Sequence, residues 1–254
     1  MISLFRKIRQ KLLEENKAGN YLKYAIGEIF LVVIGILIAL QVNNWNEQRK
    51  DKIKSYSYLV RLNEDIDLIL ADVDNSLKGA ERKLISSIMV QKALEAKDLP
   101  KSEKEHFDRY LNEYHQFYVT IQDSRTYIEM ISASGINLIE NQWIRNAFSS
   151  LADYREFIID VNRANRDAQM QNSQVFEAYV RYRFENALTD SAVSIPYYDF
   201  EAMATDEKFI NRISKQSRSW NVILNMFKGY NSQVLQIRDS VQSELKKFHS
   251  KGFQ

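Results

Sequence analysis

The spacing of histidine and carboxylate residues is the first place to look for chemistry in this chain. The chain contains three histidines and no cysteine, which excludes disulfides, thiol nucleophiles and Cys-ligated metals. Glu103 and His106 have the Glu-x-x-His spacing of one half of a di-iron site in a helical bundle. The residue three before His115 is Asn112, so a second half is missing, and His249 lies near the C-terminus. We therefore expect surface histidines and neither a metal nor another cofactor.

Motifs for nucleophilic catalysis and phosphate binding are missing from the sequence. There is no Gly-x-Ser-x-Gly elbow and no glycine-rich phosphate loop. Ser132 precedes Gly135 by three residues, a pattern more typical of a helix end than of a nucleophile. The formal charge is +2, and the aromatic residues are not interleaved with a basic stripe, so nothing indicates nucleic-acid binding. These observations favour a protein that is not an enzyme.

A polar band, residues 162–174, contains no large aliphatic side chain. Arg163 and Arg166 lie three residues apart and share a helix face, with Asp167 one turn beyond Arg163. The band fits either a solvated helix held by salt bridges or a polar layer within a bundle. In the second interpretation it forms a cavity or contact surface for an anionic group or a partner. Arg163 and Arg166 are therefore candidate contact residues.

One apolar run, Tyr24–Val42, has the length of a membrane span. Its centre, Ile29–Leu40, has no polar side chain. As a helix the run spans about 28 Å, close to the roughly 30 Å hydrocarbon core of a bilayer. It begins after more than twenty residues and lacks a small-x-small cleavage site, unlike a secretory signal. We predict an uncleaved transmembrane helix over residues 21–43.

Three residues inside the apolar run could do more than contact lipid. Glu28 lies about one turn in from Tyr24, where a carboxylate either reaches the headgroup layer or marks a partner or proton site. Gly35 and Ala39 form a small-xxx-small pair, which lets two helices approach closely. Glu28, Gly35 and Ala39 are therefore candidate membrane or partner contacts.

The charges on either side of the run predict its orientation. Six Lys and Arg residues precede it, and four follow it up to Lys54, which modestly favours a cytoplasmic N-terminus. Residues 1–20 place apolar side chains at helical spacing with basic residues between them. They form either a basic amphipathic helix on the membrane surface or a disordered tail. We expect residues 44–254 to form an extracytoplasmic domain.

The part of the chain after the run is poor in helix-breaking residues. Residues 44–254 contain two prolines and four glycines, too few for the many turns of a sheet protein. Apolar stripes at steps of three and four mark long helices. They include Leu59, Leu62, Ile66, Ile69 and Val73; Ile144, Phe148, Leu151 and Ile158; and Phe209, Ile213, Trp220, Leu224 and Phe227. We predict an all-α protein whose long helices pack as an elongated antiparallel bundle with shallow left-handed crossings.

Capping and breaking residues set the expected helix boundaries. The first long helix should end before Pro100. Capping boxes starting at Ser102 and Thr126 predict two shorter helices. Another long helix should run from about Asn141, and Asp206 should cap the last one.

Three stretches have less regular patterns. The helical stripe resumes over residues 175–182, and residues 186–204 have no periodicity, which predicts a loop. The first long helix also carries an acidic cluster without the spacing and turn glycine of a Ca²⁺ loop. Its members are Glu64, Asp65, Asp67, Asp72 and Asp74. We expect this cluster to be a solvated helix face.

The N-terminal residues resemble those of a known family. The matching elements within residues 5–50 are FRKIR at Phe5–Arg9, KYAIGE at Lys23–Glu28 and VNNWNE at Val42–Glu47, with a weaker likeness over Thr126–Gly135. On these elements the chain resembles a family of uncharacterised membrane proteins of Gram-negative bacteria, classed as a domain of unknown function. The resemblance implies a single-pass envelope protein with a helical outer domain, and it supplies no catalytic or binding residues.

Three functions follow from these observations as hypotheses. The first is a non-enzymatic protein of the bacterial inner membrane, with a cytoplasmic N-terminus and a periplasmic helical bundle. It would act as a scaffold, or bind an envelope protein or another copy of itself. The second is a ligand-sensing module that uses the polar band and signals through a partner. The third is an enzyme of unknown class. The anchor, the striped helices and the missing catalytic constellation favour the first, with the lipid bilayer as a partner and no nucleic acid.

Overall fold

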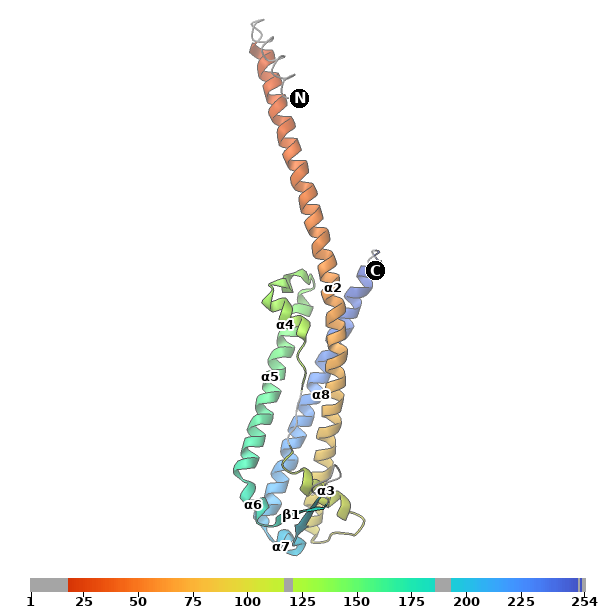
Figure 1. Ribbon diagram of the computed structural model, residues 1–254, viewed down its shortest axis with the longest axis vertical. Coiled ribbons are helices and arrows are strands. Elements are labelled where there is room, and N and C mark those ends of the chain that lie inside the picture. The colour runs from red at the N-terminus through yellow and green to blue at the C-terminus, as the bar shows by residue number, and fades with distance from the viewer. Residues whose placement is uncertain (1–17, 117–120, 186–192, 251, 253–254) are drawn as a thin grey trace. The chain divides into compact units, whose positions relative to one another are not determined.

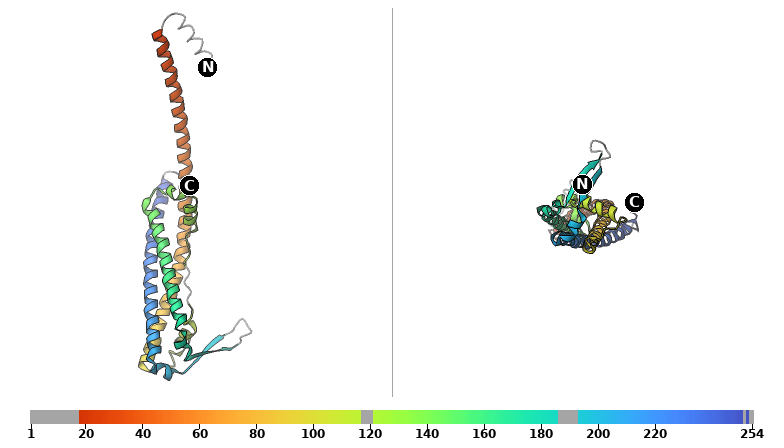
Figure 2. Two further views of the ribbon diagram at one scale, coloured as in Figure 1. Left: turned by 90° about the vertical axis from the view of Figure 1, so that its left-hand side faces the viewer. Right: turned by 90° about the horizontal axis from the view of Figure 1, so that it is seen from below.

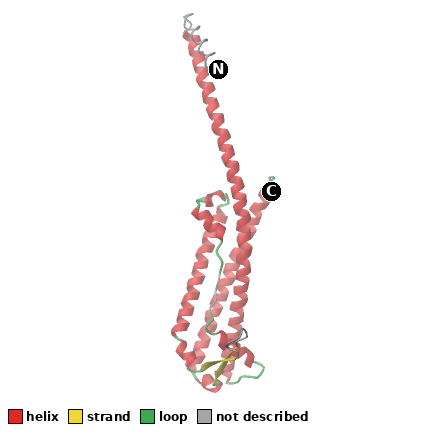
Figure 3. Cartoon of the chain, in the orientation of Figure 1, coloured by secondary structure: helices red, strands yellow, loops and turns green. Residues whose placement is uncertain are grey.

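The computed structural model describes residues 18–116, 121–185, 193–250 and 252. The chain divides into two compact units, residues 1–56 and 57–254. The long helix α2 (Ala18–Ala96) contributes residues to both. Most of the amphipathic segment predicted within residues 1–20 lies outside the described residues. Helices dominate the described chain, as Figure 3 shows, and the all-α prediction is confirmed apart from one small hairpin.

The first unit contains the apolar part of α2. Among the described residues, α2 alone is apolar and long enough to cross a membrane, by length and composition. Its most apolar stretch has a mean hydropathy of 2.5 and is 0% buried. Apolar side chains are exposed on all sides of this stretch, from Ile29 to Val42. A water-soluble helix normally exposes a polar face, whereas the described residues of this unit leave the apolar surface uncovered on all sides.

In the second unit, three long helices lie side by side, as Figure 1 shows: α2 from residue 57 onward, α5 (Gln142–Gln171) and α8 (Glu207–Ser250). The Asn141 side chain caps α5 by accepting from two backbone N–H groups, and Asp206 accepts from the N–H of Lys208 at the start of α8. Both predicted starts are therefore confirmed. The end of α2 at Ala96, before Pro100, is confirmed as well.

Contacts between the long helices fix their directions. Asn141 at the start of α5 donates to Glu244 near the end of α8, at 2.9 Å. Arg212 near the start of α8 donates to the carbonyl of Ala168 near the end of α5. α8 therefore runs antiparallel to α5, and its shared clusters with α2 (described below) show the same antiparallel relation. The antiparallel arrangement of the bundle is thus observed.

Short elements join the long helices. They are α3 (Lys104–Glu113), α4 (Arg125–Ser132), the 3₁₀ helix η1 (Gly135–Leu138), α6 (Ser173–Glu177) and α7 (Phe200–Thr205). Both predicted capping boxes are wrong. α3 follows Glu103 without a side-chain cap, and α4 is capped by Ser124, which accepts from the N–H of Tyr127 at 3.0 Å. Ser102 lies two residues before α3 and Thr126 lies within the first turn of α4, so neither occupies the N-cap position that the motif requires.

The helix predicted over residues 175–182 is confirmed only as far as Glu177, the end of α6, and a β-hairpin takes the place of its last residues and of part of the loop predicted over residues 186–204. Its strands are β1 (Val180–Glu185) and β2 (Val193–Tyr198), paired antiparallel. Figure 2 shows the hairpin extending away from the long helices. Successive side chains of β1 point to opposite faces of the sheet. The strand has six residues, too few for this alternation to stand out beside the preceding aromatic residues at helical spacing.

Two hydrophobic clusters form the core of the second unit. The first cluster joins α2, α5 and α8 through residues such as Leu62, Ile66, Phe148, Ile158, Phe227 and Val234. The second joins the end of α2 to α3, α6, α7 and the start of α8 through Leu94, Phe107, Leu111, Phe176, Met203 and Phe209. Between them, on α8, lie the buried polar residues Gln216 and Ser217. The core is therefore interrupted by polar side chains.

Candidate functional site

The residues predicted inside the apolar run lie on α2 in the first unit. Glu28 is half-buried, and Gly35 and Ala39 are exposed. A Cβ added at Gly35 would meet nothing within 4 Å, so the described chain leaves this surface open. Contact of Glu28, Gly35 and Ala39 with lipid or a partner stays a prediction.

Arg163 and Arg166 lie on the outer surface of α5, with side chains that are 58% and 50% exposed. Arg163 pairs with Asp160 at 2.7 Å rather than with Asp167, and Asp167 pairs with Arg166 at 3.0 Å. Exposed pairs of this kind contribute at most about 1 kcal/mol each to stability. A role of either arginine in binding stays a prediction.

The inward side of the polar band is buried. Asn162 and Gln169 are buried on α5. Gln169 donates from Nε2 to the carbonyl of Tyr114 at 2.6 Å. Arg212 donates from Nε to the Tyr114 hydroxyl at 3.1 Å, and from Nη2 to the carbonyl of Ala168 at 3.2 Å. The band is thus solvated on one side and part of a polar layer on the other.

The polar layer comprises Lys83, Ser87, Tyr110, Tyr114, Asn162, Gln169, Arg212, Gln216 and Ser217, drawn from four helices and the turn after α3. The Tyr110 hydroxyl donates to Oε1 of Gln216 at 2.5 Å. Burial raises the pKa of Tyr110 well above its usual value. Lys83 donates to the carbonyls of Glu113 and Gln116, where the last C=O groups of a helix lack intrahelical partners. These bonds connect α2, α3, α5 and α8 through the layer, while Oδ1 of Asn162 is buried in it without a hydrogen-bond partner.

The histidines do not assemble a metal site in the described part of the chain. His106 is exposed and His115 is half-buried. Burial lowers the pKa of His115, and its Nδ1 atom is buried without a hydrogen-bond partner. Over the described residues, no three His, Cys, Asp or Glu side chains converge as metal ligands do. The Glu103-x-x-His106 pattern therefore gains no further ligands from the described fold.

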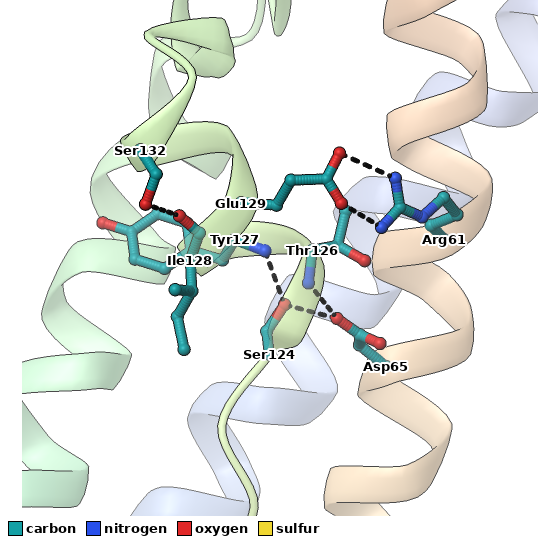
Figure 4. A network of polar contacts seen from close by, with 8 residues as sticks. All are labelled: Arg61, Asp65, Ser124, Thr126, Tyr127, Ile128, Glu129 and Ser132. Atoms are coloured by element: carbon teal, nitrogen blue, oxygen red, sulfur yellow. Dashed lines mark hydrogen bonds and ion pairs between the residues drawn. The ribbon is translucent and has the colours of Figure 1, made fainter.

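A second polar network fastens α4 to α2, as Figure 4 shows. Asp65 accepts from the Ser124 hydroxyl at 2.7 Å and from the backbone N–H of Thr126 at 2.8 Å. Arg61 makes two hydrogen bonds to the Glu129 carboxylate, one of them 3.1 Å long. The guanidinium of Arg61 lowers the pKa of Glu129 below its usual range. We call Arg61, Asp65, Ser124, Thr126 and Glu129 the α4 clasp.

Acidic residues of α2 also fasten the segment before α4. Asp72 accepts from the backbone N–H of Gln122 at 3.1 Å. On the other side, Arg155 of α5 donates to the carbonyl of Ile121 at 2.8 Å and pairs with Asp123 at 3.1 Å. The prediction of a solvated face is therefore wrong for Asp65 and Asp72. Their seven-residue spacing, which places both on one side of a helix, was the available signal.

The β-hairpin has one packed face and one exposed face. On the packed face, Tyr182 donates to the carbonyl of Leu111, and Tyr198 donates to Asp108, each at 2.6 Å. Burial raises the pKa of Tyr182 to about 12. The exposed face carries Arg181 opposite Tyr197 and Arg183 opposite Ile195. We call these four residues the outer hairpin face.

The outer hairpin face is the described surface best suited to binding. Tyr197 is 58% exposed, and the Arg183 guanidinium lies 4.8 Å from the centre of its ring. Exposed aromatic and arginine side chains are enriched at protein interfaces. This face was not predicted from the sequence, because residues 175–182 were expected to be helical and residues 186–204 to form a loop. The alternation of charged and aromatic residues from Val180 to Glu185 was the signal that could have found it.

Comparison with known proteins identifies a family but no better-known relative. A family model described as "Family of unknown function (DUF6090)" matches residues 28–194, which is more than half of the chain. Neither the curated proteins nor the solved structures that were searched gave a match. The expected likeness to a family of unknown function is confirmed, while the membrane and Gram-negative parts of that expectation stay predictions.

Proposed function

The chain belongs to the DUF6090 family of unknown function, and we propose that it is a membrane-anchored helical-bundle protein that acts by binding other proteins and catalyses no reaction itself. The observation that carries this proposal is the apolar stretch of α2, which is 0% buried and has a mean hydropathy of 2.5. The other elements of the proposal concern orientation and binding.

The anchor follows from the cost of exposing this stretch to water. Each fully buried Leu, Ile, Val or Phe side chain is worth about 1.5–3 kcal/mol relative to its exposed state. Large apolar side chains between Ile29 and Val42 are 41–68% exposed. A bilayer removes that surface from water, and the helix satisfies its own backbone hydrogen bonds there. Residues 21–43 therefore span the membrane in this proposal.

The proposed orientation places the N-terminus in the cytoplasm and residues 44–254 in the periplasm of an inner-membrane protein. The excess of Lys and Arg before the span supports it. A reporter that is active only in the periplasm should be active when fused after Gln254, and protease added to spheroplasts should degrade the second unit. Protection of residues 44–254 would reverse the orientation. Intact-mass analysis should also find the span still attached, whereas a chain beginning beyond Val42 would indicate a cleaved signal.

Interaction is proposed because the outer hairpin face presents arginine and aromatic side chains to solvent. The partner is an envelope protein or a second copy of the chain. Mild cross-linking in native membranes should yield a discrete complex larger than the monomer. A parallel variant, Gly35→Leu/Ala39→Leu, tests whether the small-residue pair mediates self-association. Recovery of monomer alone under conditions that cross-link a known membrane complex would count against the proposal.

A further inference from the structure

The two arginines of the outer hairpin face lie at alternate positions of one strand. Arg181 and Arg183 both face away from the packed side of the hairpin, and both are exposed. Residues two apart on a strand lie about 6.5–7 Å from each other on the same face. The face therefore presents two guanidinium groups at a fixed spacing along β1.

Neither arginine is neutralised within the described structure. No carboxylate of a described residue forms an ion pair or hydrogen bond with Arg181 or Arg183. Glu185 continues the same face, but no ion pair joins it to Arg183. The contact of Arg183 with the Tyr197 ring orients its guanidinium without neutralising its charge. Like charges this close favour an anionic partner, and a planar guanidinium pairs well with a carboxylate.

The backbone of β1 is also available. The sheet has two strands among the described residues, so each strand has one edge without a strand partner. The backbone of β2 is bonded to α3, because Asn112 donates to the carbonyl of Ser194 at 3.0 Å. β1 has no comparable side-chain bond on its outer edge in the described chain. An unpaired strand edge is a ready site for the addition of another strand.

We propose that the outer hairpin face binds an extended segment of a partner protein that carries acidic residues at alternate positions and adds to the edge of β1 as a third strand. Residues opposite each other on adjacent strands have Cβ atoms about 4.5–5.5 Å apart. A Glu-x-Glu pattern in the added strand therefore places one carboxylate beside each arginine. A helix can present carboxylates at a similar spacing, but its backbone groups are already paired within the helix and cannot bond to the open edge of β1. This inference rests on the proposed function and specifies its partner.

Peptide binding to the full chain in detergent micelles tests the proposal. The probe is a synthetic eight-residue peptide that alternates Glu and Thr, compared with a peptide of the same composition in which all Glu residues are contiguous. The alternating peptide should bind at least about tenfold more tightly. The Arg181→Glu/Arg183→Glu variant should bind the alternating peptide at least about tenfold more weakly than the unaltered chain, since both charge pairs become repulsive. Equal binding of the two peptides, no binding of either, or an unaffected double variant would overturn the proposal.

A matched control uses a second pair of exposed basic residues. Lys215 and Arg218 lie three apart on α8 and are both exposed. Lys215→Glu/Arg218→Glu makes the same change in net charge away from the hairpin and should leave peptide affinity unchanged. An equal loss in this control would show that total charge governs binding, and would contradict a local site.

Photo-cross-linking in native membranes separates failure of this inference from failure of the proposed function. A photoreactive phenylalanine derivative replaces Tyr197 in one variant and Phe157, an exposed residue of α5, in another. Cross-links from position 197 should map to an acidic, extended segment of a partner. Cross-links to protein only from position 157 would retain the proposed function and overturn the hairpin site. Cross-links from 197 to lipid, polysaccharide or a segment without acidic residues would overturn it as well.

Discussion

Asp65 shows how one side chain can fix the start of a neighbouring helix. The first N–H groups of a helix have no partners within the helix. In α4 the carboxylate of Asp65, which belongs to α2, accepts from Thr126 N–H and from the capping residue Ser124. A residue of one helix thus completes the cap of another. Composition alone could not distinguish Asp65 from the exposed Asp67 two positions away.

Replacement of Asp65 by Ala should destabilise the second unit by about 1–3 kcal/mol, because it leaves a buried N–H without a partner. Thr126 is only 2% exposed, so water cannot readily replace the carboxylate. The matched control is Asp67→Ala, which should change stability by less than about 0.5 kcal/mol. Thermal or urea unfolding of both variants checks the difference. Equal melting would show that the α4 clasp does not stabilise the fold.

His115 should make stability depend on pH. Burial, assisted by Arg212, lowers its pKa below the usual 6.5, and Glu177 opposes this shift. The folded state therefore binds the proton less readily than the unfolded state. The free energy of unfolding is therefore unaffected by His115 above the pKa that this residue has in the unfolded state. It decreases as the pH falls from there through the pKa of His115 in the folded state. Between about pH 7.5 and about pH 5.5, the wild type should lose more stability than His115→Gln. Parallel stability curves would contradict this assignment.

At the scale of elements, Lys83 connects α2 to the end of α3. Its ammonium group donates to the carbonyl of Glu113 at 3.3 Å and to that of Gln116, and lies 5.2 Å from the centre of the Trp220 ring. Burial lowers the pKa of Lys83. The same contacts that hold α3 therefore also hold a basic side chain within the polar layer.

Lys83→Met should reduce stability by about 1–2 kcal/mol, because it removes the charge-assisted hydrogen bonds to the carbonyls of Glu113 and Gln116. Lys78→Met is the control. Lys78 lies on the same helix, is 72% exposed and pairs only with Asp74 in the described structure, so its loss should cost less than about 0.5 kcal/mol. Urea denaturation measures both changes. A larger effect at Lys78 than at Lys83 would refute the connecting role.

Glycines on α8 and α2 should respond oppositely to alanine. A Cβ at Gly229 would lie 2.8 Å from the Tyr154 hydroxyl of α5, whereas a Cβ at Gly79 would meet nothing within 4 Å. Gly79→Ala should stabilise by about 0.5–1 kcal/mol through helix propensity. Gly229→Ala should not stabilise the wild-type chain, because the added Cβ meets the Tyr154 hydroxyl. In a Tyr154→Phe background, which removes that hydroxyl, Gly229→Ala should stabilise through helix propensity as Gly79→Ala does. Equal gains at both glycines in chemical denaturation would show that α5 and α8 are not so close.

Helices with long apolar stripes could be predicted from the sequence, whereas the short β-hairpin could not. α5 and α8 repeat their apolar stripes over many turns, and a capping residue marks each start, so their positions could be predicted from the sequence. In β1 only Val180 and Tyr182 are buried or half-buried, and aromatic residues at helical spacing precede the strand. The outer hairpin face was consequently not predicted, whereas the spacing of Arg163 and Arg166 predicted that they share a helix face and left its exposure open.

At the scale of the whole molecule, the two units differ in how apolar side chains are distributed around their helices. The stretch around Ile34 and Leu37 is apolar on every side, whereas α5 and α8 alternate apolar and polar faces. Such a contrast is visible from composition because it extends over many residues. The α4 clasp and the polar layer depend chiefly on pairs that lie between 30 and 106 residues apart along the chain. Their partners become evident only when the chain is folded.

Alkaline carbonate extraction of membranes that contain the full chain tests membrane anchoring most directly. The unaltered chain should stay in the membrane pellet, while Ile34→Lys/Leu37→Lys should move to the supernatant. Each lysine at the centre of a span costs about 2.5–3.5 kcal/mol on insertion scales, and both positions lie in the exposed apolar stretch. Release of the unaltered chain together with peripheral proteins would contradict the account.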